Sequence, residues 1–210
     1  MLENSIREQY REHFIRENLL SDDFIEFLKR NRIPFETLIS YYRCAIMEVE
    51  TKFKVLDEQY ALRYDRNPIE SMKSRVKSME SLLKKIRKKK IPFTLEAIEE
   101  NIWDIAGVRV ICSFQDDIYL LADCLLKQDD IKLIEVKDYI KYPKDNGYRS
   151  LHLLVQVPVF LTDKTEHVVI EVQIRTIAMD FWASLEHKLR YKKNLNPETA
   201  GRLARELEVC

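Results

Sequence analysis

Polar and apolar side chains alternate along residues 167–175. The apolar positions are Val168, Ile170, Val172 and Ile174, and the polar positions between them are Glu171, Gln173 and Arg175. Successive side chains of a β-strand point to opposite faces, so the acid, the amide and the guanidinium project from one face. Such a face is either the solvent side of an antiparallel sheet, which the pattern alone favours, or a surface that contacts a substrate.

A second carboxylate, Asp104, stands directly before the β-branched run Ile105–Cys112. Taken alone, Asp104 has the position of a helix cap or a turn residue. If its strand lies beside the strand of Glu171, the two carboxylates are the usual protein contribution to a Mg²⁺ site, because this cation leaves its other positions for phosphate oxygens and water. The pair therefore predicts a magnesium site, on condition that the fold brings it together.

Basic side chains gather between residues 75 and 90. Arg75 and Lys77 alternate along one expected strand, and Ser81, Lys85 and Lys88 share a face of the helix that follows it. A solvated lysine-rich helix end is the ordinary explanation, and it suffices for the remaining lysines. The alternative is a clamp for a triphosphate. Neither GxxxxGK[ST] nor GxGxxG occurs, so side chains would have to hold the phosphates.

The turn-rich segment 139–148 leads into a strand and carries aromatic and basic side chains. Lys144, Tyr148 and His152 lie in or just after it, where an aromatic ring can stack on a base. A half-buried tyrosine in an ordinary turn is an equally good interpretation. The histidines stand on separate segments without an HExxH motif, so we expect no zinc.

Regular elements must position these side chains. Charge and periodicity over residues 1–66 predict two or three amphipathic helices. Strands are expected at 69–77, 105–112, 131–137, 151–157 and 167–175. Helices are expected at 79–91, 95–100, 118–126 and 177–191. The helix at 79–91 is capped by Ser78 and stopped by Pro92. This order predicts an α+β fold, in which helices flank a mixed five-stranded sheet.

Bulk composition narrows the class of protein. With 210 residues, 46% of them hydrophobic, the chain suffices for one core of ordinary size. Lys plus Arg equals Asp plus Glu, 35 each, so no global field attracts nucleic acid or a membrane. The cysteines lack CxxC pairs, and no apolar run approaches the length that a membrane span needs. Together these two features predict a soluble, unexported cytoplasmic protein.

The chemistry-bearing segments, taken in order, resemble the synthetase domain of the RelA/SpoT homologue family, and specifically its small alarmone synthetases. The matching segments are Arg75-Val-Lys77, Asp104-Ile-Ala-Gly-Val-Arg109, Asp138-Tyr-Ile, Gly147-Tyr-Arg-Ser-Leu-His152, Glu171-Val-Gln-Ile-Arg-Thr176 and Phe181-Trp-Ala-Ser-Leu-Glu-His187. The resemblance implies a nucleotidyltransferase-like synthetase domain over residues 67–193, an N-terminal helical segment over 1–66 and the start of a C-terminal helix over 194–210.

The resemblance also implies a reaction. A GTP diphosphokinase of the bacterial stringent response transfers pyrophosphate from ATP to the 3′-hydroxyl of GDP or GTP, giving ppGpp or pppGpp and AMP. Arg75 and Arg109 would flank adenine, and Lys77, Ser81, Lys85 and Lys88 would contact the phosphates of ATP. Asp104 and Glu171 would be catalytic and would hold Mg²⁺. Tyr148 would stack on guanine, and Lys144, His152 and Gln173 would fix the acceptor, with Arg175, Glu186 and His187 in support.

Further expectations concern assembly and regulation. The resemblance implies a homotetramer, and the product alarmone and single-stranded RNA are its candidate regulators. The His-Asp motif of the family's hydrolase domain does not occur, so we expect synthesis without hydrolysis. Lys88 stands where some relatives have arginine, so its phosphate contact is the weakest of the set. Two alternatives remain open: a catalytically silent nucleotide- or RNA-binding regulator, and a nucleotidyltransferase that releases pyrophosphate instead of AMP.

Overall fold

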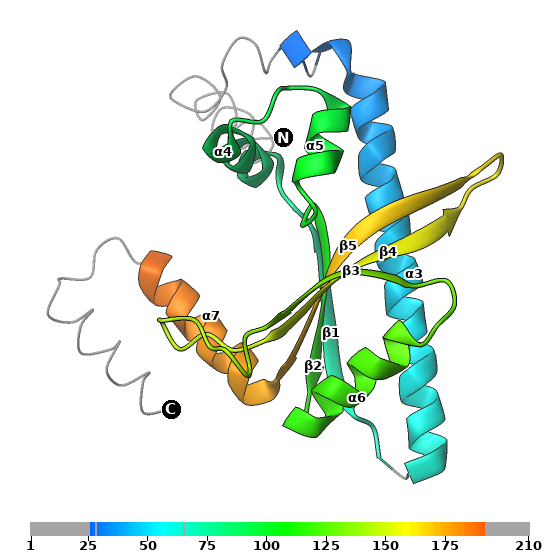
Figure 1. Ribbon diagram of the computed structural model, residues 1–210, viewed down its shortest axis with the longest axis vertical. Helices are drawn as coiled ribbons and strands as arrows, with labels where there is room; N and C mark the ends of the chain where they lie inside the picture. Colours follow the sequence, from blue (N-terminus) through cyan, green and yellow to red (C-terminus); the bar gives the residue numbers. More distant parts are fainter. Residues whose placement is uncertain (1–25, 28, 65, 192–210) are drawn as a thin grey trace, which may run out of the picture.

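A five-stranded mixed sheet organises the chain in the computed structural model, which describes residues 26–27, 29–64 and 66–191. Its spatial order is β1-β2-β5-β4-β3, with β2 and β5 parallel and the other neighbours antiparallel. Helices α3 and α6 lie on one side of this sheet, α7 lies on the other, and α4 lies beyond one end of the strands (Figure 1). The predicted α+β class and the mixed five-stranded sheet are confirmed.

The strands fall where alternation predicts them, with two extensions. They are β1 Ile69–Val76, β2 Ala106–Cys112, β3 Lys132–Asp138, β4 Leu151–Phe160 and β5 Thr165–Thr176. The hairpin of β4 and β5 continues past the expected end at residue 157, through Pro158 to the pair Phe160 and Thr165. Proline is tolerated there because β3 stops pairing with β4 at Gln156, which leaves that edge of β4 free.

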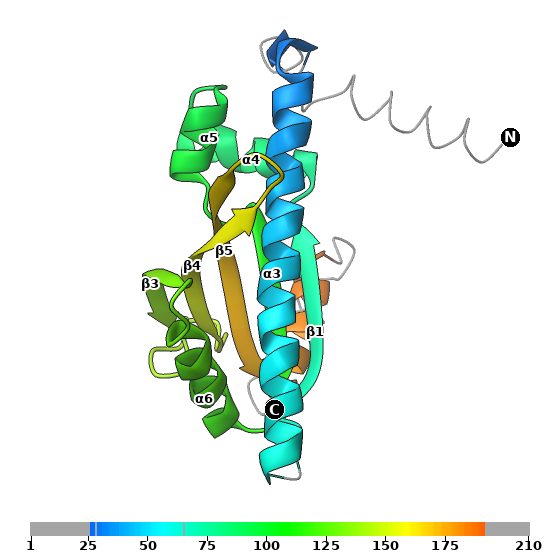
Figure 2. The same ribbon diagram turned by 90° about the vertical axis from the view of Figure 1, so that its right-hand side faces the viewer.

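The sequence predicts two or three helices over residues 1–66, and the structure describes helical residues at 26–27 and 29–30, a turn at Asn31 and then helix α3, Arg32–Tyr64, of 33 residues. Pro34 lies in its first turn, where a missing N–H breaks no helical hydrogen bond. One face, including Tyr42, Val49 and Phe53, is buried against the sheet. Figure 2 shows α3 running along the face of the sheet that it covers. Helix α3 therefore supports the sheet from the face opposite to the polar side chains Glu171 and Gln173. The rest of the predicted N-terminal helices lies outside the described residues.

The other helices are α4 Met79–Lys89, α5 Leu95–Asn101, α6 Gln115–Leu126 and α7 Ile177–Tyr191. Ser78 caps α4 by accepting a hydrogen bond from the backbone N–H of Ser81, as predicted. Helix α4 ends before Pro92 because Lys90 adopts the left-handed conformation, with a φ of 55°. Helix α6 begins at Gln115, three residues before the predicted Ile118, and the buried Asp117 in its first turn is paired with Arg66.

Helix length and apolarity bear on membrane association. Within the described ranges, no helix is both long and apolar enough to cross a membrane. The predicted division of the chain at residues 66 and 193 stays a prediction. The expected C-terminal helix, residues 194–210, lies outside the described residues.

Candidate active site

A pocket of about 160 Å³ opens on the sheet face opposite α3. It is lined by Lys73, Ser74, Arg75, Asp104, Gly107, Val108, Arg109, Glu171 and Gln173. Strand register explains the gathering: Gly107 pairs with both Arg75 and Glu171, and Arg109 pairs with both Lys73 and Gln173. The parallel pairing of β2 with β5 thus brings Asp104, at the entrance of β2, to the same pocket as Glu171. The polar face of β5 lines a pocket and is not a plain solvent-facing surface.

Asp104 lies between two lysines. Its Oδ2 accepts a hydrogen bond from Nζ of Lys77 at 3.0 Å, and Nζ of Lys85 lies 2.7 Å from Oδ1. The second contact is an ion pair without hydrogen-bond alignment, so Oδ1 is buried with no hydrogen-bond partner. Burial, the largest influence, raises the pKa of Asp104, but the two ammonium groups together outweigh burial and lower the pKa below its ordinary value. Asp104 is therefore an ionised carboxylate whose two oxygens each face a lysine ammonium group.

Glu171 is held by two neighbours on the sheet. Its Oε1 lies 3.1 Å from Nδ1 of His152, and its Oε2 accepts a hydrogen bond from Nε2 of Gln173 at 2.7 Å. Burial raises the pKa of Glu171 most strongly, and the nearby charge of Asp104 raises it further. The contacts with His152 and Gln173 outweigh both and lower the pKa. Glu171 is thus ionised and oriented towards the pocket that it shares with Asp104.

A chain of hydrogen bonds leads from Arg175 to Glu171. Arg175 NH2 donates to the hydroxyl of Tyr148 at 2.6 Å, and this hydroxyl lies 2.9 Å from Nε2 of His152. Since the Tyr148 oxygen already accepts from Arg175, its own proton is available to Nε2, which leaves the Nδ1 proton for Glu171. Arg175 also donates to Oε1 of Gln173 at 2.8 Å. These contacts join Tyr148, His152 and Gln173, three of the four predicted acceptor residues, into one network.

The loop between β3 and β4 presents aromatic rings next to this network. Lys144 Nζ lies 4.4 Å from the ring centroid of Tyr139 and 4.8 Å from that of Tyr148. Tyr139 also meets His152 edge to face at 5.1 Å. Tyr139 is not among the predicted site residues, although it lies within the matching segment Asp138-Tyr-Ile. The structure adds Tyr139 to the predicted residues.

Asp180 is the other site residue that sequence reasoning missed. It lies in the first turn of α7 with 7% of its surface exposed, and its carboxylate contacts Arg109, Arg175 and Lys73. An acid in the first turn of a helix is accounted for by the helix dipole alone, so its position in the sequence indicated nothing more. Only the packing of α7 against β2 and β5 brings it to the site.

Two predicted residues lie apart from the pocket. Ser81 and Lys88 are exposed on α4, and neither lines the pocket. The Ser81 hydroxyl accepts a hydrogen bond from Ser78 at 2.9 Å. Lys85, on the same helix, does reach Asp104. The predicted basic face is therefore only partly joined to the carboxylates.

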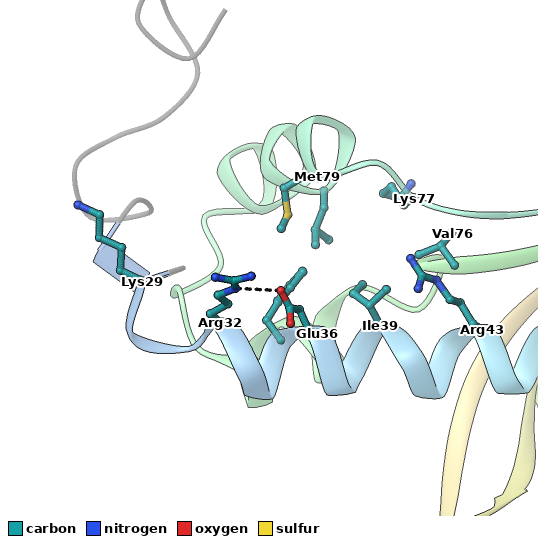
Figure 3. Close-up of a pocket in the computed structure, with 10 residues that line it drawn as sticks. Lys29, Arg32, Glu36, Ile39, Arg43, Val76, Lys77 and Met79 are labelled. Atoms are coloured by element: carbon teal, nitrogen blue, oxygen red, sulfur yellow. Dashed lines mark hydrogen bonds and ion pairs between the residues drawn. The ribbon is translucent and has the colours of Figure 1, made fainter. Parts of the chain in front are cut away.

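A second pocket, of about 900 Å³, lies between α3 and α4 (Figure 3). Apolar side chains such as Ile39, Val76 and Met79 line much of it, and Arg32 pairs with Glu36 at 3.1 Å. Successive strand residues face opposite sides of a sheet, so Val76 lines this pocket whereas Arg75 lines the smaller one. Its only member among the predicted site residues is Lys77. The smaller pocket is the candidate active site, because it contains both carboxylates.

The described residues supply only some of the oxygen ligands that a metal ion needs. Within the described ranges, no group of three or more His, Cys, Asp and Glu side chains is arranged to hold a metal. Asp104 and Glu171 nevertheless share the pocket, and both are ionised. Two carboxylate oxygens suit Mg²⁺, which retains several waters and binds substrate phosphates. The residues present therefore fit a divalent cation that arrives with a nucleotide.

Comparison with known proteins identifies the family of the chain. The family model described as "Region found in RelA / SpoT proteins" matches residues 74–196. The chain is 47% identical over 189 residues to GTP pyrophosphokinase YwaC of Bacillus subtilis, an alignment that covers 90% of this chain and 89% of YwaC. It is 41% identical over 162 residues to GTP pyrophosphokinase YjbM of the same organism, covering 77% and 75%.

Solved structures give the same result. Small alarmone synthetase 2 from B. subtilis superposes with a TM-score of 0.72 at 44% identity, covering 84% of this chain and 91% of that chain. Small alarmone synthetase 1 from B. subtilis, bound to its product pppGpp, superposes with a TM-score of 0.74 at 40% identity, covering 84% and 90%. The chain therefore belongs to the RelA/SpoT family and, within it, to the small alarmone synthetases.

Proposed function

We propose that this chain is a GTP diphosphokinase, which transfers the β,γ-pyrophosphate of ATP to the 3′-hydroxyl of GDP or GTP. The products would be ppGpp or pppGpp, together with AMP, as in the bacterial stringent response. The observation that carries the proposal is the convergence of Asp104 and Glu171 in one pocket with Arg75 and Arg109. The names of the relatives YwaC and YjbM support it.

The donor nucleotide would lie along β1, β2 and α4. Arg75 and Arg109 come from paired strands and line the same pocket, so their planar guanidinium groups suit stacking on the faces of adenine. Lys77 and Lys85 already face a carboxylate and would turn to the phosphates of ATP. Ser81 and Lys88 are exposed on the same helix, where they would meet phosphates that extend beyond the pocket.

We further propose that Asp104 and Glu171 hold Mg²⁺ together with the triphosphate. The shared pocket of these two carboxylates, and their lowered pKa values, support this assignment. Such an ion would supply neutralisation of phosphate charge and polarisation of the phosphoryl oxygens. The carboxylates' own part is to orient the triphosphate at the pocket.

The acceptor nucleotide would bind on the side of the β3–β4 loop. Tyr148 would stack on guanine, and Lys144, His152 and Gln173 would fix the nucleotide beside Glu171. Glu171 would accept the proton of the 3′-hydroxyl. The 3′-oxygen would form a bond to the β-phosphorus of ATP while the bond from that phosphorus to the oxygen bridging to the α-phosphate breaks. AMP would leave with the bridging oxygen, and positioning would supply most of the rate.

Product analysis tests the proposal. The purified chain is incubated with ATP, Mg²⁺ and GDP or GTP, and the nucleotides are separated by anion-exchange chromatography. We expect AMP and a 3′-pyrophosphorylated guanosine nucleotide in equal amounts. Pyrophosphate in place of AMP would identify a nucleotidyltransferase instead. Nucleotide binding without any product would identify the silent regulator.

Three further properties remain proposals of the same kind. We propose a homotetramer, a cytoplasmic location and synthesis without alarmone hydrolysis. Free thiols at Cys44, Cys112 and Cys124 support a reducing compartment. The exposed apolar side chains Leu133 and Val136 on the edge strand β3 support association between subunits. Regulation by the product alarmone or by single-stranded RNA stays a prediction.

A further inference from the structure

Asp180 connects cationic side chains from three strands of the sheet. Its Oδ1 lies 3.1 Å from NH1 of Arg109 and 3.4 Å from NH1 of Arg175, and its Oδ2 lies 3.2 Å from Nζ of Lys73. We propose that Asp180 is a positioning residue that holds Arg109 for the donor nucleotide and Arg175 for the acceptor network, and so couples the two subsites. The inference rests on the proposed function.

The two arginines need such a partner. Arg175 is 2% exposed, and burial lowers the pKa of its guanidinium. The positive charge of Arg109 lowers this pKa further, whereas the charge of Asp180 raises it. A buried cation beside a second cation is unfavourable unless a carboxylate compensates both. Asp180 provides this charge from α7, outside the strands that carry the arginines.

The contacts of each arginine lead to a different subsite. Arg109 lines the pocket beside Arg75, where adenine is proposed to bind. Arg175 donates to Tyr148 and Gln173, which are proposed to bind the acceptor. Asp180 itself does not line the pocket, so its influence on either nucleotide must pass through an arginine.

One oxygen serves both guanidinium groups, and this sharing is the physical basis of coupling. When the donor nucleotide draws Arg109 towards its base, the contact between Oδ1 of Asp180 and Arg175 changes. When the acceptor nucleotide moves Arg175, the contact between Oδ1 and Arg109 changes in turn. Occupation of one subsite therefore changes the affinity of the other by the same factor. Couplings of this kind are typically about 5- to 150-fold.

Calorimetry of nucleotide binding tests the proposal. The probes are α,β-methylene-ATP and GDP, each titrated alone and then with the other at saturation, in the presence of Mg²⁺. In Asp180→Asn we expect each nucleotide to bind about 10-fold more weakly alone, and the coupling factor to fall towards one. Asp180→Glu keeps the charge, so it should retain part of the wild-type affinity for each nucleotide and part of the coupling between them. Asp163→Asn, in the exposed turn between β4 and β5, is the matched charge control and should behave as wild type.

Double-mutant cycles separate positioning from a merely structural role. If Asp180 acts through Arg109, then Asp180→Asn adds little to the weakened ATP-analogue binding of Arg109→Gln. By the same reasoning it adds little to the weakened GDP binding of Arg175→Gln. A purely structural defect would add its full effect in both backgrounds and would overturn the proposal. If Asp180→Asn does not fold, the same cycles with Asp180→Glu decide the question.

Binding and turnover distinguish the two proposals. Wild-type protein that binds both probes but yields no AMP would refute the proposed function, while the cycles would still decide the role of Asp180. Normal turnover with unchanged affinities and coupling in Asp180→Asn would refute only the role of Asp180. Wild-type protein that binds neither probe would refute both.

Discussion

At the scale of single residues, Glu171 is the group whose contacts suit proton transfer. Replacing Glu171 by glutamine keeps the shape of the side chain and removes the base. We expect kcat to fall by a factor of about 10² to 10⁴, with the far-UV circular dichroism unchanged. The measurement is AMP release under saturating ATP and GDP. Glu166→Gln is the control, because Glu166 lies on the same strand but pairs with Lys164 outside the pocket. Turnover retained by Glu171→Gln would remove the assigned role.

The lowered pKa values of Asp104 and Glu171 predict how stability depends on pH. A carboxylate whose folded-state pKa is depressed contributes stability above its ordinary pKa and loses it as the pH falls through the folded value. The ordinary values are 3.8 for Asp104 and 4.5 for Glu171. We therefore expect these groups to leave the melting temperature unchanged between pH 8 and about 5, and to lower it below about 4.5.

Thermal unfolding from pH 7 to pH 3 measures this dependence. Glu171→Gln should flatten the acid side of the curve, since glutamine does not titrate. An exposed glutamate such as Glu58, changed to glutamine, serves as the control. A fall in melting temperature between pH 7 and pH 5 that Glu171→Gln abolishes would contradict the direction of the pKa shift.

At the scale of elements, α3 is the support on which the strands of the site rest. Phe53 is 0% exposed at the interface with the sheet, whereas Val55, two residues on, is 62% exposed. Phe53→Ala should lower the free energy of unfolding by roughly 3–5 kcal/mol. Val55→Ala should change it by no more than about 0.5 kcal/mol. Urea titration followed by circular dichroism compares them. Equal effects at both positions would show that α3 does not pack as described.

The loop that carries Tyr148 depends on one glycine. Gly147 has a φ of +81°, and a Cβ at this position would lie 3.3 Å from Cζ2 of Trp182. Gly147→Ala should therefore cost about 1–2 kcal/mol of stability and raise KM for GDP, because the strained loop displaces Tyr148. The exposed neighbour Asp145, changed to alanine, provides the comparison. Kinetics with GDP varied at saturating ATP measures the effect, and an unchanged KM would argue against a role of this loop in acceptor binding.

At the scale of the whole molecule, the proposed homotetramer predicts a particle of about four times the 25.1 kDa of one chain. Sedimentation velocity at several protein concentrations measures this mass directly. Changing Leu133 and Val136 to serine removes exposed apolar surface from β3 without touching the pocket, and should shift the distribution towards smaller species if this edge is an interface. A wild-type chain that sediments as a monomer at all concentrations would refute the proposal.

The local pattern of the sequence determined most of the elements. Alternation predicted that Glu171 and Gln173 share a face, and residue type predicted the cap at Ser78. These features depend on neighbours only a few positions apart, so the sequence contains them directly. The length of α3 could not be read from local pattern, because the packing that supports 33 continuous residues comes from distant strands.

Only the tertiary structure decided which of these side chains meet. The parallel pairing of β2 with β5 brings Asp104 to the pocket of Glu171, and the docking of α7 places Asp180 between Arg109 and Arg175. The sequence by itself determined the types and the faces of the polar residues, since both follow from local backbone geometry. Strand order and helix docking depend on burial summed over the whole chain, so the meeting of these residues is a property of the fold.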